Sequence, residues 1–190
     1  MPFEGTVPDR AEAWSLLCEW TKSDALRGHA QAVEAAMRAY ALKYSEPEEL
    51  WGAIGLLHDF DYERYPDAED HPAKGAEELR ARGYDVDFIN AILGHAEYTG
   101  VARDTLAAKV LFAVDELCGL VVATAYVMPE KTLAEVAAKS VRKKMKSKGF
   151  ARKVNREEIV SGTEDLNIDL MEHIETVVAA LQSASDKIGL

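Results

Sequence analysis

Residues 55–63 read GLLHDFDYE, an apolar run that ends in a histidine followed by three acidic residues. The residues before it, EELWGAI (48–54), place apolar side chains at helical spacing, so the stretch predicts the end of a helix that leaves the core. Such a helix end either reaches solvent or holds a cation between its imidazole and its carboxylates. The rest of the sequence decides between these two interpretations.

Helical spacing of apolar residues recurs along the chain, and no segment shows sustained alternation of β-branched and polar residues. Ser23 and Asp85 are suited to cap helices, and Pro47 and Pro72 to begin them. The pattern predicts helices over about 9–21, 24–44, 47–58, 72–82, 86–98, 103–126 and 169–185, with one or two short ones after Pro129. We therefore expect an all-α, single-domain helical bundle over residues 1–190, with helices of 130–190 packed on a core of about 25–125.

Composition excludes several classes of function. The net charge of −11 argues against general binding to nucleic acid or to an anionic membrane. No basic start with an apolar stretch marks a secretion signal, and no run of eighteen apolar residues predicts a membrane span. The two cysteines, Cys18 and Cys118, form no CxxC pair, which favours a reducing compartment, so we expect a cytoplasmic protein.

The segment from Lys139 to Arg156 contrasts with this acidic background, because it carries nine of the 22 basic residues and no acidic one. It is either a solvated helix face that balances acidic neighbours or a surface that attracts anions. The second interpretation requires a site nearby.

Four of the five histidines lie at positions with predicted structure. His29 falls on the buried stripe of its helix, His58 at a helix end, His71 at a helix entry and His95 on a buried helix face. A single histidine on an apolar face is more often a core residue with one satisfied hydrogen bond. The fifth, His173, fits no shared pattern and is interpreted as structural or exposed.

Two acids give the histidines a common explanation. Asp59 directly follows His58, and Asp115 lies on the mostly apolar helix 103–126, where it should point inward. An ionised carboxylate there is costly unless a cation or donors meet it. A metal ion explains the six residues together, since nitrogen and oxygen ligands without thiolate suit Mn, Fe, Co, Ni or Zn, with Mg less favoured. Six ligands allow one divalent ion or two bridged by a carboxylate.

These residues carry a resemblance to a known family. The order His29, His58-Asp59, Asp115 resembles the His…His-Asp…Asp signature of the HD-domain superfamily of metal-dependent phosphohydrolases. The blocks LLHDFDYERYP (56–66), HPAKGAEELRARGY (71–84) and ILGHAEYTG (92–100) are similar to the core of small bacterial HD-domain proteins of the HDIG type, over roughly residues 25–125. The chain departs from that type in reading HDFD where those proteins read His-Asp-Ile-Gly.

The resemblance implies a ligand set and a reaction. In it, His29, His58, Asp59 and Asp115 hold one ion, and His71 and His95 match the positions that bind a second ion in members that have one, with Asp59 bridging. The implied activity is hydrolysis of a small phosphorylated substrate, a nucleotide or another phosphate ester, by attack of metal-activated hydroxide on phosphorus.

Further residues are candidates for supporting roles. Asp61 is a candidate acceptor or proton shuttle behind the ligands, and Lys74 could steady a substrate oxygen; the alternatives are a loop acid and a solvated lysine. Arg103 could bind the substrate or form a surface salt bridge. The candidates for phosphate steering are Arg142, Lys143, Lys144 and Lys146.

Two other functions stay open at this point. Some di-iron members of the superfamily are oxygenases that cleave a C–C or C–P bond with a similar ligand set. A sensor that keeps metal and ligand but turns over little is the other alternative. The sequence is compatible with a monomer or a homodimer.

Overall fold

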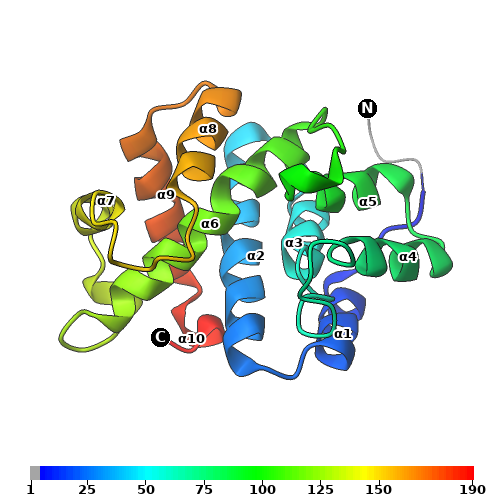
Figure 1. Ribbon diagram of the computed structural model, residues 1–190, viewed down its shortest axis with the longest axis horizontal. Coiled ribbons are helices and arrows are strands. Elements are labelled where there is room, and N and C mark those ends of the chain that lie inside the picture. Colours follow the sequence, from blue (N-terminus) through cyan, green and yellow to red (C-terminus); the bar gives the residue numbers. More distant parts are fainter. Residues whose placement is uncertain (1–4) are drawn as a thin grey trace.

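Every regular element in residues 5–190, the part of the chain that the computed structural model describes, is a helix (Figure 1). The α-helices are α1 (Arg10–Trp20), α2 (Asp24–Tyr44), α3 (Glu48–Leu57), α4 (Ala73–Ala81), α5 (Val86–Leu93), α6 (Leu106–Tyr126), α7 (Ala138–Met145), α8 (Arg156–Leu166), α9 (Leu170–Ser183) and α10 (Ser185–Ile188). Two 3-10 helices are η1 (Glu97–Thr99) and η2 (Leu133–Glu135). The expected all-α class is confirmed.

Two predicted caps set the starts of their helices. The Ser23 hydroxyl accepts a hydrogen bond from the backbone N–H of Leu26, and the Asp85 carboxylate accepts from the N–H groups of Asp87 and Phe88. These bonds satisfy backbone donors that have no partner inside the helix. Short polar side chains therefore fix where α2 and α5 begin.

One helix is shorter than the sequence predicts. The expected helix 86–98 ends at Leu93, so His95 follows the helix and does not lie on its face. The Thr99 hydroxyl lies 3.0 Å from the carbonyl oxygen of Leu93 and 2.8 Å from that of Ala96, which provides a partner for carbonyls at the helix end. The chain turns at Gly94, and this turn directs His95 inward.

Helices α2 and α6 form the centre of the fold, with α6 crossing α2 diagonally (Figure 1). On one side α2 packs against α3, and on the other α9 packs against α2 and α6. Gly55 allows the close approach of α3, because a Cβ at this position would lie 2.9 Å from backbone atoms of Glu34. This contact places the end of α3, and thus His58, beside α2.

A buried histidine joins three of these helices. His173 of α9 is fully buried; its Nε2–H donates to the Ala113 carbonyl at 2.8 Å, and its Nδ1 accepts from the Tyr40 hydroxyl at 2.6 Å. Burial lowers the pKa of His173 to about 4, so the ring is neutral at pH 7. His173 is structural, one of the two interpretations that the sequence allows.

Buried residues of the core come from both the 25–125 region and the helices that follow it. Among residues 5–190, no helix is both long enough and apolar enough to cross a membrane. Cys18 and Cys118 are free thiols.

Candidate metal centre

The six predicted ligands meet at one place, although they come from five separate parts of the chain. His29 is on α2 and Asp115 on α6, while His58 and Asp59 directly follow α3. His71 ends the loop before α4, and His95 follows α5. Six side chains lie close together at this place: His29, His58, Asp59, His71, His95 and Asp115.

Two of the histidines have their Nδ1 side fixed by the backbone. His58 Nδ1 lies 2.8 Å from the Gly55 carbonyl, and His95 Nδ1 lies 2.6 Å from the Ile92 carbonyl. A carbonyl only accepts, so each Nδ1 carries the proton and each neutral ring presents an Nε2 lone pair on its opposite side. Both rings are buried, His58 completely.

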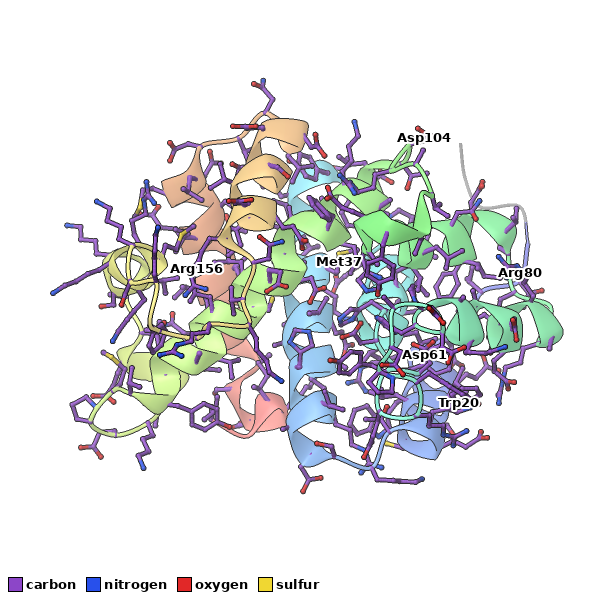
Figure 2. All side chains as sticks on the ribbon, viewed as in Figure 1. Trp20, Met37, Asp61, Arg80, Asp104 and Arg156 are labelled. Carbon is purple, nitrogen blue, oxygen red and sulfur yellow. The ribbon has the colours of Figure 1, made fainter. Side chains whose placement is uncertain are left out.

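His71 is fixed in the same sense by a carboxylate. Its Nδ1 lies 2.8 Å from Asp61 Oδ1, and the other oxygen of Asp61 accepts from the Gly75 backbone N–H at 2.7 Å. Asp61 is fully buried in the loop that connects α3 with α4 (Figure 2). It therefore orients the His71 ring and turns Nε2 toward the other ligands.

The Nε2 atoms converge on Asp59. The Nε2 atoms of His71 and His95 both lie 3.2 Å from Asp59 Oδ1, and His58 Nε2 lies 3.5 Å from Oδ2. With neutral rings and an ionised Asp59, these nitrogens and oxygens are all acceptors, so they repel unless a proton or a metal cation lies between them. His58 Nε2 is buried without a hydrogen-bond partner in the described chain, as expected for an atom that faces a cation site.

His29 and Asp115 complete the cluster. Asp115 Oδ1 lies 2.9 Å from His29 Nε2 and 3.4 Å from His58 Nε2. Side-chain atoms form two groups compact enough to hold a metal ion, one of His29, His58 and Asp59 and one of Asp59, His71 and His95. The groups share Asp59, and their imidazoles and carboxylates are ligand types that suit divalent cations.

The electrostatics of the cluster favour positive charge at its centre. Burial lowers the pKa of His58, but the charges of Asp59 and Asp115 outweigh it and raise the pKa well above its usual value. For His71, hydrogen bonds to Asp59 and Asp61 likewise exceed the effect of burial and raise the pKa to about 9. Without a metal, protons therefore occupy the positions that a cation would take, and metal binding has to displace them.

A pocket of about 560 Å³ opens beside the cluster. Besides the candidate ligands, the described residues of its wall include the phenol rings of Tyr62 and Tyr98 and one lysine, Lys153. Five carboxylates line it, those of Asp59, Glu97, Asp115, Glu116 and Glu158. Burial, together with the charge of Asp115, raises the pKa of Glu116 to about 7. The pocket is thus acidic around a centre suited to cations.

The residues that the sequence suggested for substrate binding lie elsewhere. Lys74 is partly exposed and pairs with Glu77 at 3.0 Å. Arg103 stacks over the Phe112 ring at 3.7 Å and lies near Glu97 and Asp165. The four basic residues chosen for phosphate steering are on α7 or directly after it and do not line the pocket: Arg142, Lys143, Lys144 and Lys146.

Sequence reasoning missed the loop that carries Lys153 to the pocket. The Arg156 guanidinium donates to the carbonyls of Ala151 and Val154, at 2.8 and 2.6 Å, and also to that of Phe150. This arginine folds the loop before α8 around itself, and Lys153 and Val154 then line the pocket. The only sequence signal was that Lys153 and Arg156 lie within the basic segment.

Asn155 attaches the same loop to α6. Its backbone N–H donates to the Glu116 carboxylate at 3.0 Å, and its side-chain amide donates to Glu158 at 2.6 Å. Asn155 also caps α8, because its side-chain oxygen accepts hydrogen bonds from the backbone N–H groups of Glu157 and Glu158. The carboxylates of Glu116 and Glu158 are held in place as part of the pocket wall.

The chain is a helical bundle that brings together histidines and aspartates from separate parts of the chain. This arrangement is typical of a class of metal-binding α-helical proteins. Comparison with protein-family models matches residues 26–120 to the HD domain. Because this match covers half of the chain, the protein belongs to the HD domain family, whose members are generally metal-dependent phosphohydrolases. Comparison with curated proteins and with solved structures found no significant match. The HDIG subtype stays a prediction.

Proposed function

We propose that the protein is a metal-dependent phosphohydrolase that acts on a small phosphorylated substrate, a nucleotide or another phosphate ester. The observation that carries the proposal is the convergence of three imidazole lone pairs on the Asp59 carboxylate, at 3.2 to 3.5 Å, with the opposite side of each ring already bonded. This arrangement is unfavourable without a cation and suited to one.

The distances support ligands of common ions. Ligand atoms about 2.1 Å from one ion and at right angles to each other lie about 3 Å apart. The separations of 2.9 Å between His29 and Asp115 and 3.2 Å between His71 and Asp59 are close to this value. In the proposal, His29, His58, Asp59 and Asp115 hold one ion and Asp59, His71 and His95 a second. The nitrogen and oxygen ligands favour a divalent transition metal.

Bound divalent ions lower the pKa of a water molecule and neutralise the charge that develops on phosphoryl oxygens. The residues of the chain position the reactants. Asp61 holds the His71 ring by accepting from its Nδ1–H, and Lys153 is the cation in the pocket wall that can pair with a phosphoryl oxygen. No side chain needs to serve as the nucleophile.

Elemental analysis of protein purified without added metal, followed by a phosphate-release panel of nucleotides and simple phosphate esters, tests the proposal. We expect bound transition metal and phosphate release that stops when a chelator is added. The variants His58→Ala and Asp59→Ala should lose metal and activity while circular dichroism shows that they fold. His173→Gln replaces a buried histidine outside the cluster and should keep its metal.

Two outcomes contradict the proposal. Full metal content in Asp59→Ala would refute the ligand set. Oxygen uptake by an iron-loaded protein that releases no phosphate would instead favour the oxygenase alternative, in which the same side chains hold two irons.

A further inference from the structure

Gly119 of α6 is a glycine that helix packing does not require. Glycine in a helix interior is destabilising by about 0.5–1 kcal/mol relative to alanine. At Gly55 and Gly162 an added Cβ would meet backbone atoms at 2.9 and 2.6 Å, which explains the missing side chain. At Gly119 its nearest neighbour would be Val154 Cγ2 at 3.8 Å, an ordinary contact. Another reason has to account for the glycine.

The position of Gly119 provides that reason. It lies four residues after Asp115, one helical turn along α6, and lines the pocket beside the candidate metal centre. It also lines a second pocket of about 410 Å³, and His29 is shared by both walls. The two pockets thus border each other at a residue without a side chain.

The second pocket is mainly apolar. It is lined by residues of the start of α2, the second half of α6 and the C-terminal segment with α10, and α10 lies beside the lower end of α2 in Figure 1. Its apolar wall consists of Ala25, Val122, Tyr126, Ile188 and Leu190. Apart from His29, the described residues contribute one side chain that can carry a charge, the carboxylate of Asp24. A polar or charged group gains few partners there, whereas an alkyl or aromatic group would lose contact with water.

We propose that Gly119 is a specificity-determining residue, which leaves open a passage from the metal centre to the apolar pocket, and that the substrate is a phosphate monoester with an apolar alcohol part. This inference rests on the proposed function. The phosphate lies at the metal centre beside His29, and the organic group passes over Gly119 toward Val122 and Ile188. A side chain at position 119 would obstruct this path.

Alkylphosphonates test the inference without requiring turnover. Binding of methylphosphonate and hexylphosphonate to the metal-loaded protein is measured by calorimetry. Burial of a methylene strengthens binding by up to about fourfold, so five additional methylenes, even half buried, should give an advantage of at least about 30-fold. In Gly119→Leu the hexyl advantage should fall below about threefold, while affinity for methylphosphonate stays the same.

Two further variants keep the test independent of folding defects. Gly119→Ala adds one methyl group that meets only Val154 at contact distance, and it should reduce the hexyl advantage partly while raising the melting temperature. Ala123→Leu adds the same leucine on the same helix, at a position that lines neither pocket, and should keep the full advantage.

The results separate this inference from the proposed function. Phosphate release with equal affinity for the two phosphonates would refute the apolar substrate alone. An unchanged hexyl advantage in Gly119→Leu would refute the passage. If neither phosphonate binds to metal-loaded protein, both the phosphate site and the inference are wrong.

Discussion

The substitution Asp61→Asn should weaken one metal ion selectively. Both oxygens of Asp61 accept hydrogen bonds, one from His71 Nδ1–H at 2.8 Å and one from the Gly75 N–H at 2.7 Å. Asparagine has one acceptor and one donor at the same positions. The NH2 group of the asparagine must then face either the His71 Nδ1–H or the Gly75 N–H, and both of these are donors.

Each orientation has a cost that can be estimated. If the amide group faces His71, the ring must shift its proton to Nε2, and the lone pair aimed at Asp59 is lost. If it faces Gly75, a buried N–H is left without an acceptor, at about 1–3 kcal/mol. Because 1.4 kcal/mol corresponds to a factor of ten, the ion held by His71 and His95 should bind about 10- to 100-fold more weakly. The ion held by His29, His58 and Asp115 should be almost unaffected.

Metal titration against a chromogenic chelator resolves two dissociation constants and checks this prediction. Asp67→Asn changes an exposed aspartate of the same loop and should leave both constants unchanged. Wild-type affinity at both sites in Asp61→Asn, or an equal loss at both, would refute the reasoning that Asp61 acts through His71.

Three further predictions concern stability and the pocket loop. The pKa of His173 is about 4 in the folded protein and about 6.5 in the unfolded chain, so the unfolded state binds more protons between these two values. The free energy of unfolding should therefore fall between pH 6.5 and pH 4.5. Urea denaturation should show that this fall is about 2–3 kcal/mol larger in wild type than in His173→Gln. Arg156→Met should release the loop carbonyls and raise KM for the phosphorylated substrate about tenfold at unchanged metal content, and Arg156→Lys should not restore KM because it lacks the planar fork. Gly55→Ala should destabilise the fold by about 1–3 kcal/mol in thermal unfolding, because a Cβ at position 55 would lie closer than 3.0 Å to backbone atoms. Gly119→Ala should stabilise the fold by up to about 1 kcal/mol, because a Cβ at position 119 meets no such contact.

Each of these predictions has an outcome that contradicts it. Parallel pH profiles for wild type and His173→Gln would show that this ring does not control acid stability. Loss of metal together with the rise in KM would mean that Arg156 supports more than the loop. Similar melting temperatures for the two glycine variants would contradict the packing argument.

Local signals in the sequence were sufficient for most of the fold. Ser23 caps α2 where the sequence places it, and the caps and apolar spacing give its bounds, Asp24–Tyr44, to the residue. The end of α5 was missed because the helical spacing of Phe88, Ile92 and His95 continues past Gly94, although glycine commonly ends a helix. The Thr99 hydroxyl donates to the Leu93 carbonyl from six residues further along the chain. This contact depends on a turn that the sequence pattern does not reveal.

The candidate site was predictable in its centre and not in its outer wall. The ligand candidates follow from residue types that are costly to bury, such as Asp115, and the structure brings them together, although their role as ligands stays a prediction. The pocket wall depends on tertiary contacts. Lys153 lines the pocket because Arg156 folds the preceding loop, whereas Lys143 and its neighbours on α7 follow their helix away from it. A charge run identifies a segment but not the one residue that faces the site.

The sign of the charge in the pocket gives the metal a second role beyond chemistry. Without a metal, protons on His58 and His71 offset part of the charge of Asp59 and Asp115. In the outer wall, Glu97, Glu158 and the partly ionised Glu116 outnumber Lys153, the one lysine that the described residues contribute, so this wall repels a phosphate group. Ions at the shared carboxylate of Asp59 would reverse this sign only at the centre, while Glu97, Glu116 and Glu158 stay in the outer wall. A phosphate would therefore be attracted to the one place where hydrolysis can occur and repelled from the rest of the pocket. In the proposed function, the ions that would activate the reaction would also decide where the substrate binds, and the acidic wall would improve its placement.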